Sequence, residues 1–185
     1  MRRKIKTVAV YCGHTFGLSP TFVRDAGLMG ELIAKNCLNM VFGGSEAGLM
    51  GVVSDAALIN GAHVIGISTE HVIAKQEPAH KHIEVKIVSG VNERKQKMFE
   101  LSDAFIIMPG GIGTLNEVTD ILTMQQIGET NKPVFFLNTN RFWAPLHALI
   151  IDMRSNDFIE TLDDYNVLIA NTPHELMHAL LNYKG

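Results

Sequence analysis

The sequence of 185 residues is short of cysteine, of long hydrophobic runs and of positive charge, and each shortage excludes a class of protein. Two cysteines, Cys12 and Cys37, are too few for a disulfide framework, and we expect reduced thiols in a cytoplasmic protein. No stretch approaches the roughly 20 apolar residues of a membrane span. The apolar run 8–12, behind the basic amino-terminal residues, is too short for a signal peptide. We therefore predict no membrane partner.

Lysine and arginine number 16 against 19 aspartates and glutamates, which leaves a net charge of -3. A general nucleic-acid-binding protein carries a basic excess, so we predict no nucleic-acid partner. Two nucleotide-binding motifs are also absent: the dinucleotide pattern G-x-G-x-x-G and the P-loop that ends in Gly-Lys-Ser/Thr. Their absence argues against NAD binding and ATP hydrolysis.

The remaining composition, with 46% hydrophobic and 19% charged residues, is that of an ordinary globular protein. No linker or repeat divides the chain, so we expect residues 1–185 to form a single domain. Strand-like and helix-like patterns alternate, which predicts an α/β, Rossmann-like doubly wound parallel sheet with helices on both faces. The predicted strands are 7–12, 39–42, 63–67, 85–88, 103–108, 133–137 and 165–169. The predicted helices are 20–36, 49–60, 92–101, 114–127, 142–154 and 173–182.

Two segments need separate interpretation. Residues 68–91 are the least regular part of the chain, and we expect a loop that contains Glu77-Pro78, a short strand and a lid over the site. The apolar segment 142–153 favours a place in the core, but its surplus of apolar surface would also suit part of a dimer interface.

The stretch 108–117, Met-Pro-Gly-Gly-Ile-Gly-Thr-Leu-Asn-Glu, carries the strongest functional pattern. Its glycines, Gly110, Gly111 and Gly113, lie where a buried strand is expected to end and a helix to begin. In open α/β sheets that junction binds anions, because free backbone N–H groups and the positive end of the helix dipole converge there. Glycine also lets the backbone turn sharply and lets a phosphate come close. We therefore predict a phosphate site.

Two other predicted strands also end in glycine, at Cys12-Gly13 and Gly43-Gly44. The carboxyl ends of parallel strands share one edge of the sheet, so these loops and Gly110-Gly111 can line one crevice. Three glycine-bearing loops at one edge predict a nucleotide-sized ligand.

Glu117, just after the glycines, has two interpretations. In the first, Thr114 caps the helix and Glu117 bonds back to the cap; the same capping box recurs at Thr172 and Glu175, with Pro173 between them. In the second, Glu117 stabilises a developing cation beside the phosphate. An N-glycosidic bond to ribose 5-phosphate breaks through an oxocarbenium-like sugar, so such a site needs both an anion-binding loop and a carboxylate.

Glu93-Arg94-Lys95 opens the predicted helix that precedes this strand. The planar guanidinium of Arg94 could hold a phosphate or orient a ligand. The alternative is a solvated helix end, which is common for arginine and lysine. A basic pair in the first turn opposes the helix dipole, however, and this favours a functional role.

His174-Glu175-Leu176-Met177-His178 matches the zinc-protease pattern H-E-x-x-H. A third ligand is expected further along, but only residues 179–185 remain, and the capping box accounts for Glu175. We therefore predict no metal site there, and a solvated loop at His80-Lys81-His82.

Glu93-Arg94-Lys95 together with the stretch 109–117 resembles the Lonely Guy (LOG) family. These are the cytokinin riboside 5'-monophosphate phosphoribohydrolases, often mislabelled lysine decarboxylases. Further matches, which extend the resemblance over nearly the whole chain, are Cys12-Gly13, Gly43-Gly44, Gly48-Leu49-Met50-Gly51, Lys132-Pro133-Val134 and Leu137-Asn138. A pyridoxal-phosphate decarboxylase is not expected, since the chain is short and no lysine is placed as a Schiff-base former.

The resemblance implies a hydrolase that cleaves the N-glycosidic bond of AMP or N6-modified AMP to a free base and ribose 5-phosphate. It also implies no metal or redox cofactor, a homodimer or larger homo-oligomer, and Arg94 and Glu117 as the catalytic pair. The three loops and the resemblance together suggest these substrate-binding residues: Gly13, His14, Gly43, Gly44, Lys95, Gly110, Gly111, Gly113 and Thr114. The alternative function is a non-catalytic nucleotide-binding or carrier module of the same fold.

The chain departs from the family pattern at three places. His14 and Thr15 replace two small hydroxyl residues of the first loop, and Val91-Asn92 replaces the usual Met-His before Glu93. Residues 68–86 also differ. These positions are expected near the base and ribose, so they bear on base specificity.

Overall fold

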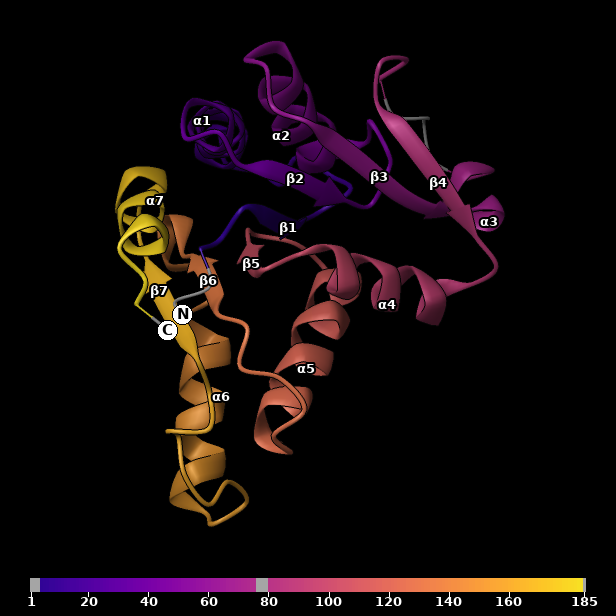
Figure 1. Ribbon diagram of the computed structural model, residues 1–185. Coiled ribbons are helices and arrows are strands. Elements are labelled where there is room, and N and C mark those ends of the chain that lie inside the picture. Colours follow the sequence, from indigo (N-terminus) through magenta and orange to yellow (C-terminus); the bar gives the residue numbers. More distant parts are fainter. Residues whose placement is uncertain (1–3, 76–79, 185) are drawn as a thin grey trace.

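A computed structural model describes residues 4–75 and 80–184, which build one seven-stranded sheet covered by helices (Figure 1). The strands are β1 (Thr7–Tyr11), β2 (Asn39–Phe42), β3 (Val64–Thr69), β4 (Glu84–Val88), β5 (Ala104–Ile107), β6 (Val134–Leu137) and β7 (Val167–Ala170). The helices are α1 (Pro20–Lys35), α2 (Gly48–Ile59), α3 (Glu70–Ile73), α4 (Val91–Leu101), α5 (Ile112–Gln126), α6 (Ala144–Ser155) and α7 (Pro173–Leu181), with a 3-10 turn η1 (Thr139–Arg141). The predicted α/β class is confirmed.

The strand order is β4-β3-β2-β1-β5-β6-β7, and neighbouring strands are parallel. The chain builds outward from β1 to β4, returns to the middle, and builds outward again from β5 to β7. Ala9 of β1 therefore lies between Val41 of β2 and Phe105 of β5. The connections that follow β1 and β5 diverge at this point, and in doubly wound sheets the divergence leaves a crevice where ligands bind.

Side chains alternate between two cores because successive residues of a strand point to opposite faces. On β1, Val8 and Val10 join the core under α1, α2 and α7, whereas Ala9 and Tyr11 join the core under α4, α5 and α6. Figure 1 shows these two groups of helices on opposite sides of the sheet. The doubly wound arrangement with helices on both faces is thus confirmed.

The predicted bounds agree with the structure to within two residues, but two short elements were missed. In the irregular region, β3 continues to Thr69, whose hydroxyl oxygen accepts the Val72 N–H at 3.2 Å and so begins α3. The predicted short strand is present as β4. Glu77-Pro78 lies outside the described residues, and the lid remains a prediction. The second missed element, η1, contains Asn140 with a φ of 54°.

The prediction that 142–153 belongs to the core is confirmed for Trp143, which is buried in the core under α4, α5 and α6, and is wrong for the helix that follows it. No residue of α6 is buried, and the side chains of Leu149 and Met153 are 49% and 40% exposed. Leu146 and Ile150 pack only partly against the second core. The reason is the position of α6, which extends away from the sheet in the lower part of Figure 1.

Two local expectations are confirmed. Thr172 caps α7 by accepting the Glu175 N–H at 3.2 Å, with Pro173 in the first turn, although the Glu175 carboxylate accepts from Asn171 N–H rather than from the cap residue. Cys12 and Cys37 are free thiols. Among the described helices, none is both long and apolar enough to cross a membrane.

Gly30 allows α1 and α2 to pack closely. A Cβ at Gly30 would lie 2.4 Å from the carbonyl oxygen of Val53 and 2.8 Å from the nitrogen of Ala57, both backbone atoms of α2. Gly27, one turn earlier on the same helix, has space: a Cβ there would lie 3.8 Å from a methyl group of Val52. Gly27 and Gly30 therefore differ in the space for a side chain although they lie on the same helix.

We predict opposite effects of alanine at these two positions. Both substitutions should stabilise α1 by about 1 kcal/mol, because alanine has a higher helix propensity than glycine. Gly27→Ala should keep this gain, whereas in Gly30→Ala overpacking of about 1 to 3 kcal/mol should exceed or cancel it. Urea unfolding should place the midpoint of Gly27→Ala above that of Gly30→Ala. Equal midpoints would show that the α1–α2 contact is not tight.

Candidate functional site

A cavity of about 160 Å³ opens at the divergence between β1 and β5. Of the eleven site residues predicted from the sequence, eight line it: Gly13, His14, Gly43, Arg94, Gly111, Gly113, Thr114 and Glu117. Three do not: Gly44, Lys95 and Gly110. The fold thus brings the glycine loops and the charged pair together around one space.

The loops at the mouth of this cavity bond directly to one another. The N–H of Gly13 donates to the carbonyl oxygen of Pro109 at 3.0 Å, and the N–H of Leu49 donates to the carbonyl oxygen of Gly13 at 3.1 Å. A Cβ at Gly110 would lie 2.2 Å from the Thr114 hydroxyl oxygen and 2.9 Å from the nitrogen of Gly13. Gly110 therefore serves the close approach of two loops and is not among the residues that line the cavity.

The start of α5 corrects the capping-box interpretation of Thr114 and Glu117. The helix begins at Ile112, so Thr114 is its third residue and is buried. The residue at the cap position is Gly111, which has no side chain to bond the first N–H groups. Glu117 does not reach back to the cap, because its carboxylate bonds Arg94. The first N–H groups of α5 are consequently available to an anion.

Arg94 and Glu117 form an ion pair that is nearly shielded from water. Arg94 Nη1 donates to Glu117 Oε1 at 2.9 Å, and Arg94 Nε donates to the carbonyl oxygen of Ile67 at 3.0 Å. The two side chains are 13% and 10% exposed. Breaking such a pair by removing one partner typically costs about 3 to 5 kcal/mol. The solvated-helix-end interpretation of Arg94 is therefore wrong.

Gly43 makes room for the Arg94 guanidinium. A Cβ at Gly43 would lie 2.3 Å from Arg94 Nη2 and 2.9 Å from the sulfur of Met50. Gly44 has a different role, since its φ of +72° is in the left-handed region and a Cβ there would lie 3.2 Å from the Cβ of Ser68. The first glycine shapes the site, and the second allows the turn against β3.

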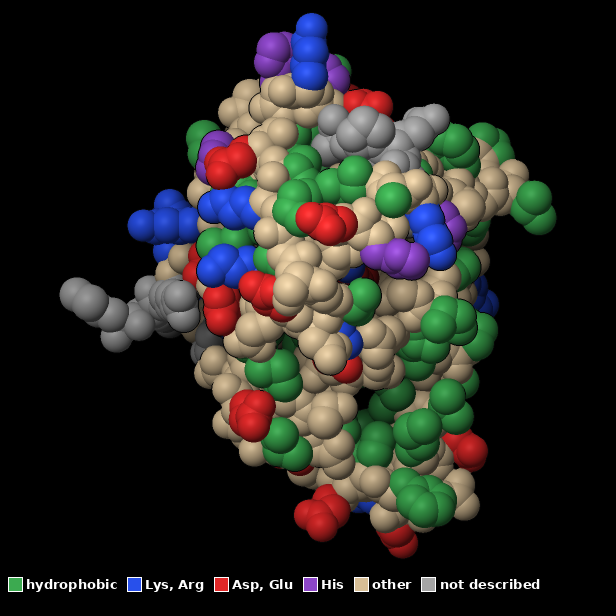
Figure 2. All heavy atoms as spheres, turned by 90° about the vertical axis from the view of Figure 1, so that its right-hand side faces the viewer, with side chains coloured by type: hydrophobic (Ala, Val, Ile, Leu, Met, Phe, Trp, Pro, Cys, Tyr) green, Lys and Arg blue, Asp and Glu red, His purple; other side chains and the backbone are tan. Residues whose placement is uncertain are grey.

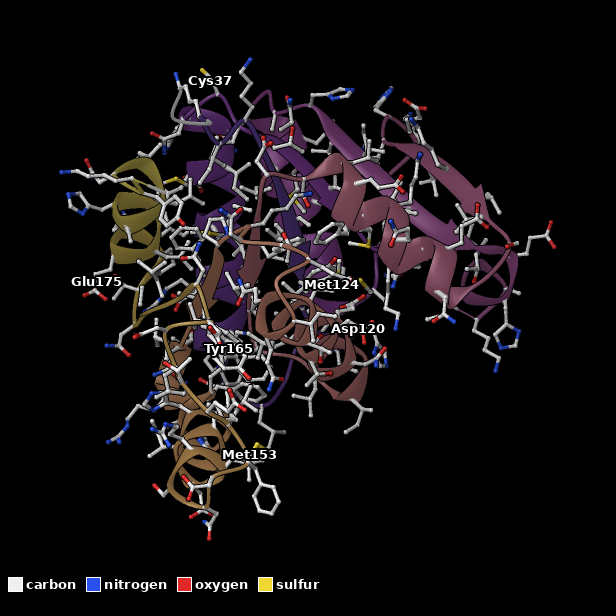
Figure 3. All side chains as sticks on the ribbon, turned by 60° about the horizontal axis from the view of Figure 1, so that its bottom comes forward. Cys37, Asp120, Met124, Met153, Tyr165 and Glu175 are labelled. Carbon is white, nitrogen blue, oxygen red and sulfur yellow. The ribbon has the colours of Figure 1, made fainter. Side chains whose placement is uncertain are left out.

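Lys95 points away from the cavity. Its Nζ lies 2.5 Å from Asp120 Oδ2 and 2.9 Å from Asn116 Oδ1. Figure 3 shows Asp120 on the side of α5 that faces α4. Lys95 instead lines a second cavity, which shares Glu117 with the first. Two ion pairs therefore join α4 to α5: Arg94 with Glu117, and Lys95 with Asp120.

The surroundings of Glu117 adjust its acidity in opposite directions. Burial raises the pKa of Glu117, and the positive charges of Arg94 and then Lys95 partly offset this rise. Burial also raises the pKa values of Tyr11 and Cys12, with the negative charge of Glu117 as a further cause. Tyr11 and Cys12 therefore stay neutral near pH 7, and the phenol and thiol beside Glu117 add no charge to the site.

Sequence reasoning missed the apolar part of the cavity wall. Tyr11, Met50, Val72 and Ile112 all line the cavity. Met50 and Ile112 lie between the glycines of two motifs, and this position in the sequence could have predicted that they line the cavity. Val72 belongs to α3, in the region without a regular pattern, and nothing in the sequence identified it.

Comparisons with known proteins agree with this geometry. Residues 50–180 match the family model described as "Possible lysine decarboxylase". The chain is 35% identical over 182 residues to the cytokinin riboside 5'-monophosphate phosphoribohydrolase LOG of Oryza sativa subsp. japonica, covering 98% of this chain and 75% of the rice protein. It is 38% identical over 166 residues to the cytokinin riboside 5'-monophosphate phosphoribohydrolase of Rhodococcoides fascians, covering 89% of this chain and 84% of the bacterial protein. The chain belongs to the LOG family.

The fold comparison extends beyond enzymes of this name. The molybdenum cofactor binding protein from the phototrophic bacterium Rippkaea orientalis has a similar structure, with a TM-score of 0.66, 25% sequence identity and 96% of each chain covered. The Rossmann-like fold predicted for this LOG-family chain is thereby confirmed. Because a binding protein shares the fold, the function must be argued from the site.

The name of the family model finds no support in the first cavity, whose lining includes no lysine that could form a Schiff base. The H-E-x-x-H pattern lies on α7, where the Glu175 carboxylate accepts a hydrogen bond from the Asn171 N–H. Across residues 4–75 and 80–184, no group of three or more His, Cys, Asp or Glu side chains could hold a metal ion. The rings of His80 and His82 lie 5.2 Å apart, in the segment before β4. Histidine and lysine side chains protrude at the top of the molecule in Figure 2.

We predict that Gly43→Ala displaces Arg94 and raises the pKa of Glu117, because Arg94 lowers that pKa in the native protein. A carbon-13 NMR titration of the Glu117 carboxyl, assigned with Glu117→Gln, would measure the change. Gly90→Ala is the matched control, since a Cβ at Gly90 meets nothing within 4 Å. The control should titrate as the wild type does. An unchanged pKa in Gly43→Ala would refute the role assigned to Gly43.

Proposed function

We propose that the protein hydrolyses the N-glycosidic bond of adenosine 5'-monophosphates, including N6-modified ones, to a free base and ribose 5-phosphate. The observation that carries this proposal is the buried Arg94–Glu117 pair, which lies one helical turn from an anion-binding helix start. The two relatives named above are phosphoribohydrolases of cytokinin riboside 5'-monophosphates, which supports the same reaction type.

The start of α5 is proposed to hold the 5'-phosphate. A Cβ at Gly111 or at Gly113 would meet nothing within 4 Å, so a phosphate can approach the backbone there. The unpaired N–H groups of the first turn and the helix dipole both favour an anion. Thr114 and Arg94 line the same cavity and can complete the phosphate contacts.

Glu117 is proposed to act on the sugar. As the C–N bond breaks, its electron pair leaves with the base and positive charge develops on the ribose ring, which the Glu117 carboxylate stabilises. A water molecule then adds to the anomeric carbon and gives up a proton, while the base takes up a proton. Arg94 keeps the carboxylate in place, and its positive charge opposes the rise in the pKa of Glu117 that burial causes.

A carrier or binding module is the second candidate function, and the similarity to the molybdenum cofactor binding protein favours it. Such a module needs the anion site but has no physical need for a carboxylate buried beside it. The closeness of Glu117 to the anion site therefore supports the enzyme over the carrier.

We predict that the purified protein releases free base from AMP or from N6-isopentenyl-AMP, as measured by chromatography. Glu117→Gln keeps an oxygen for Arg94 but loses the charge, so kcat should fall by about 100- to 1,000-fold. The Gly27→Ala variant, whose site is intact, should keep wild-type turnover. Nucleotide binding without base release would favour the carrier, and full turnover by Glu117→Gln would contradict the mechanism. The ratio of the two rates would identify the preferred base.

We further propose that the protein is cytoplasmic, that residues 1–185 form one domain, and that two copies or more associate through the exposed apolar side of α6. Leu149 and Met153 lie one turn apart on α6 and are 49% and 40% exposed, and Phe158 just beyond is 81% exposed. Figure 2 shows hydrophobic side chains gathered in the lower part of the molecule, at the height of α6 in Figure 1. Apolar patches of this kind mark association sites.

We predict that the double variant Leu149→Lys, Met153→Lys lowers the mass of the protein in solution from an oligomer to a monomer, because two charges would have to be buried in the interface. Light scattering after size exclusion would measure this mass. Ile59→Lys is the control, since Ile59 is 80% exposed on α2, away from the patch. If the double variant remained an oligomer, α6 would not be part of the interface.

A further inference from the structure

A third cavity, the α1–α7 cavity, lies between α1, η1 and the start of α7 and has a volume of about 290 Å³. Figure 1 shows α1 and α7 next to each other on one face of the sheet. The described residues that line this cavity all differ from those that line the first one. Its volume is close to the lower limit of about 300 Å³ for pockets that hold small molecules. We propose that the α1–α7 cavity binds a small neutral molecule rich in hydroxyl groups, such as a monosaccharide.

A buried carboxylate forms part of the wall of this cavity. Asp25 of α1 is 3% exposed, and Asp25 Oδ2 accepts a hydrogen bond from the Thr139 hydroxyl at 2.7 Å. Asp25 Oδ1 accepts hydrogen bonds from Arg24 Nε at 3.0 Å and from Arg24 Nη2 at 2.8 Å. A carboxylate has about four acceptor positions, so within the described structure one position remains for a donor on a ligand.

Two asparagine amides on the cavity wall offer one acceptor and one donor. Asn140 Nδ2 donates to Ser19 Oγ at 3.1 Å, which leaves the Asn140 amide oxygen as an acceptor for a ligand. Asn171 Oδ1 accepts from Asn138 Nδ2 at 3.1 Å, which leaves the Asn171 amide nitrogen as a donor. A hydroxyl group both donates and accepts. Neighbouring hydroxyls of one molecule can therefore satisfy both amides together.

The cavity suits a neutral molecule better than an anion. Helices α1 and α7 both begin with proline, which has no N–H. The cap side chains, Ser19 and Thr172, each accept a further N–H of the first turn, at 3.3 Å and 3.2 Å. The start of α5 differs, because its cap residue is a glycine. The charge of Arg24 is also paired with that of Asp25, so neither the helix starts nor the ion pair favours a negative ligand.

The apolar part of the wall gives a role to a residue of the H-E-x-x-H pattern. His174 lines the α1–α7 cavity together with Leu28 and Pro173. Small-molecule sites combine apolar surface with a few fixed polar groups, and these side chains can cover the C–H face of a sugar ring. His174 therefore lies at a candidate ligand site although the pattern does not form a metal site.

A purely structural role for Asp25 is the competing explanation. The Asp25–Thr139 hydrogen bond joins residues 114 positions apart and holds η1 against α1. That contact alone needs no open space beside it. The cavity next to the carboxylate and the amide groups around it favour a ligand over a tether.

The test is binding of D-ribose, D-glucose, myo-inositol and inorganic phosphate, measured by calorimetry and by saturation-transfer NMR. At least one of the three hydroxyl-rich compounds should bind with a Kd of about 1 to 10 mM, whereas phosphate should not bind in this cavity. Leu28→Trp, which fills the cavity, should abolish the binding. Lys35→Trp is the matched control, since Lys35 is exposed at the end of the same helix and lies outside the cavity.

Asn171→Ala gives an independent check that does not alter the core, because the Asn171 side chain is exposed. Loss of one hydrogen bond should raise the Kd by about two- to tenfold. Urea unfolding would show that each variant is folded. The assay contains no nucleotide, so its result does not depend on whether the protein hydrolyses AMP.

Four results would overturn the inference. If none of the three compounds bound, the cavity would have no ligand of this class. Binding that persisted in folded Leu28→Trp, or that ribose 5-phosphate displaced, would place the compound elsewhere, as in the first cavity. An unchanged Kd in Asn171→Ala would contradict the hydrogen-bonding role of the amide. Phosphate binding that Leu28→Trp abolished would make the cavity an anion site.

Discussion

A buried ion pair between two helices holds the candidate site together. Arg94 and Glu117 come from α4 and α5, which lie on the same face of the sheet, and both side chains are almost fully shielded from water. Charges in such a place need partners, because the desolvation of a lone ion costs several kcal/mol. The surrounding backbone is built around this requirement. The carbonyl oxygen of Ile67 takes one N–H of the guanidinium, and Gly43 leaves the space in which another part of it lies.

The same pair reconciles two opposing electrostatic demands. The start of α5 attracts an anion, whereas Glu117 attracts positive charge, and only about 4.5 Å of helix separates Thr114 from Glu117. A carboxylate that near a phosphate would be repelled if it were unpaired. Arg94 pairs with it and lines the same cavity, which under the proposed function would let the site hold a phosphate and still present a carboxylate to the sugar. A pure anion binder would have no use for this arrangement.

The comparison with a molybdenum cofactor binding protein shows how little the fold alone decides. The two chains align over 96% of their length, yet the name of one describes binding and the names of the sequence relatives describe hydrolysis. A doubly wound sheet offers an anion site at its divergence whichever function it serves. In the proposed mechanism the difference in function depends on Glu117, which lies one turn beyond that site.

The sequence by itself determined the α/β class, the order of nearly all elements, the glycine loops and the charged pair, because these depend on local patterns: short apolar runs, helical spacing, and glycines at strand ends. It could not determine the roles of individual residues within those patterns. Thr114 and Glu117 match a capping box in the sequence, yet the helix begins two residues earlier and Glu117 is bound to a residue 23 positions away. Likewise, Lys95 follows Arg94 but points into a different cavity, since adjacent helical residues face directions about 100° apart. The exposed side of α6 and the contribution of Val72 were decided only by how the elements pack, and packing depends on contacts between residues far apart in the chain.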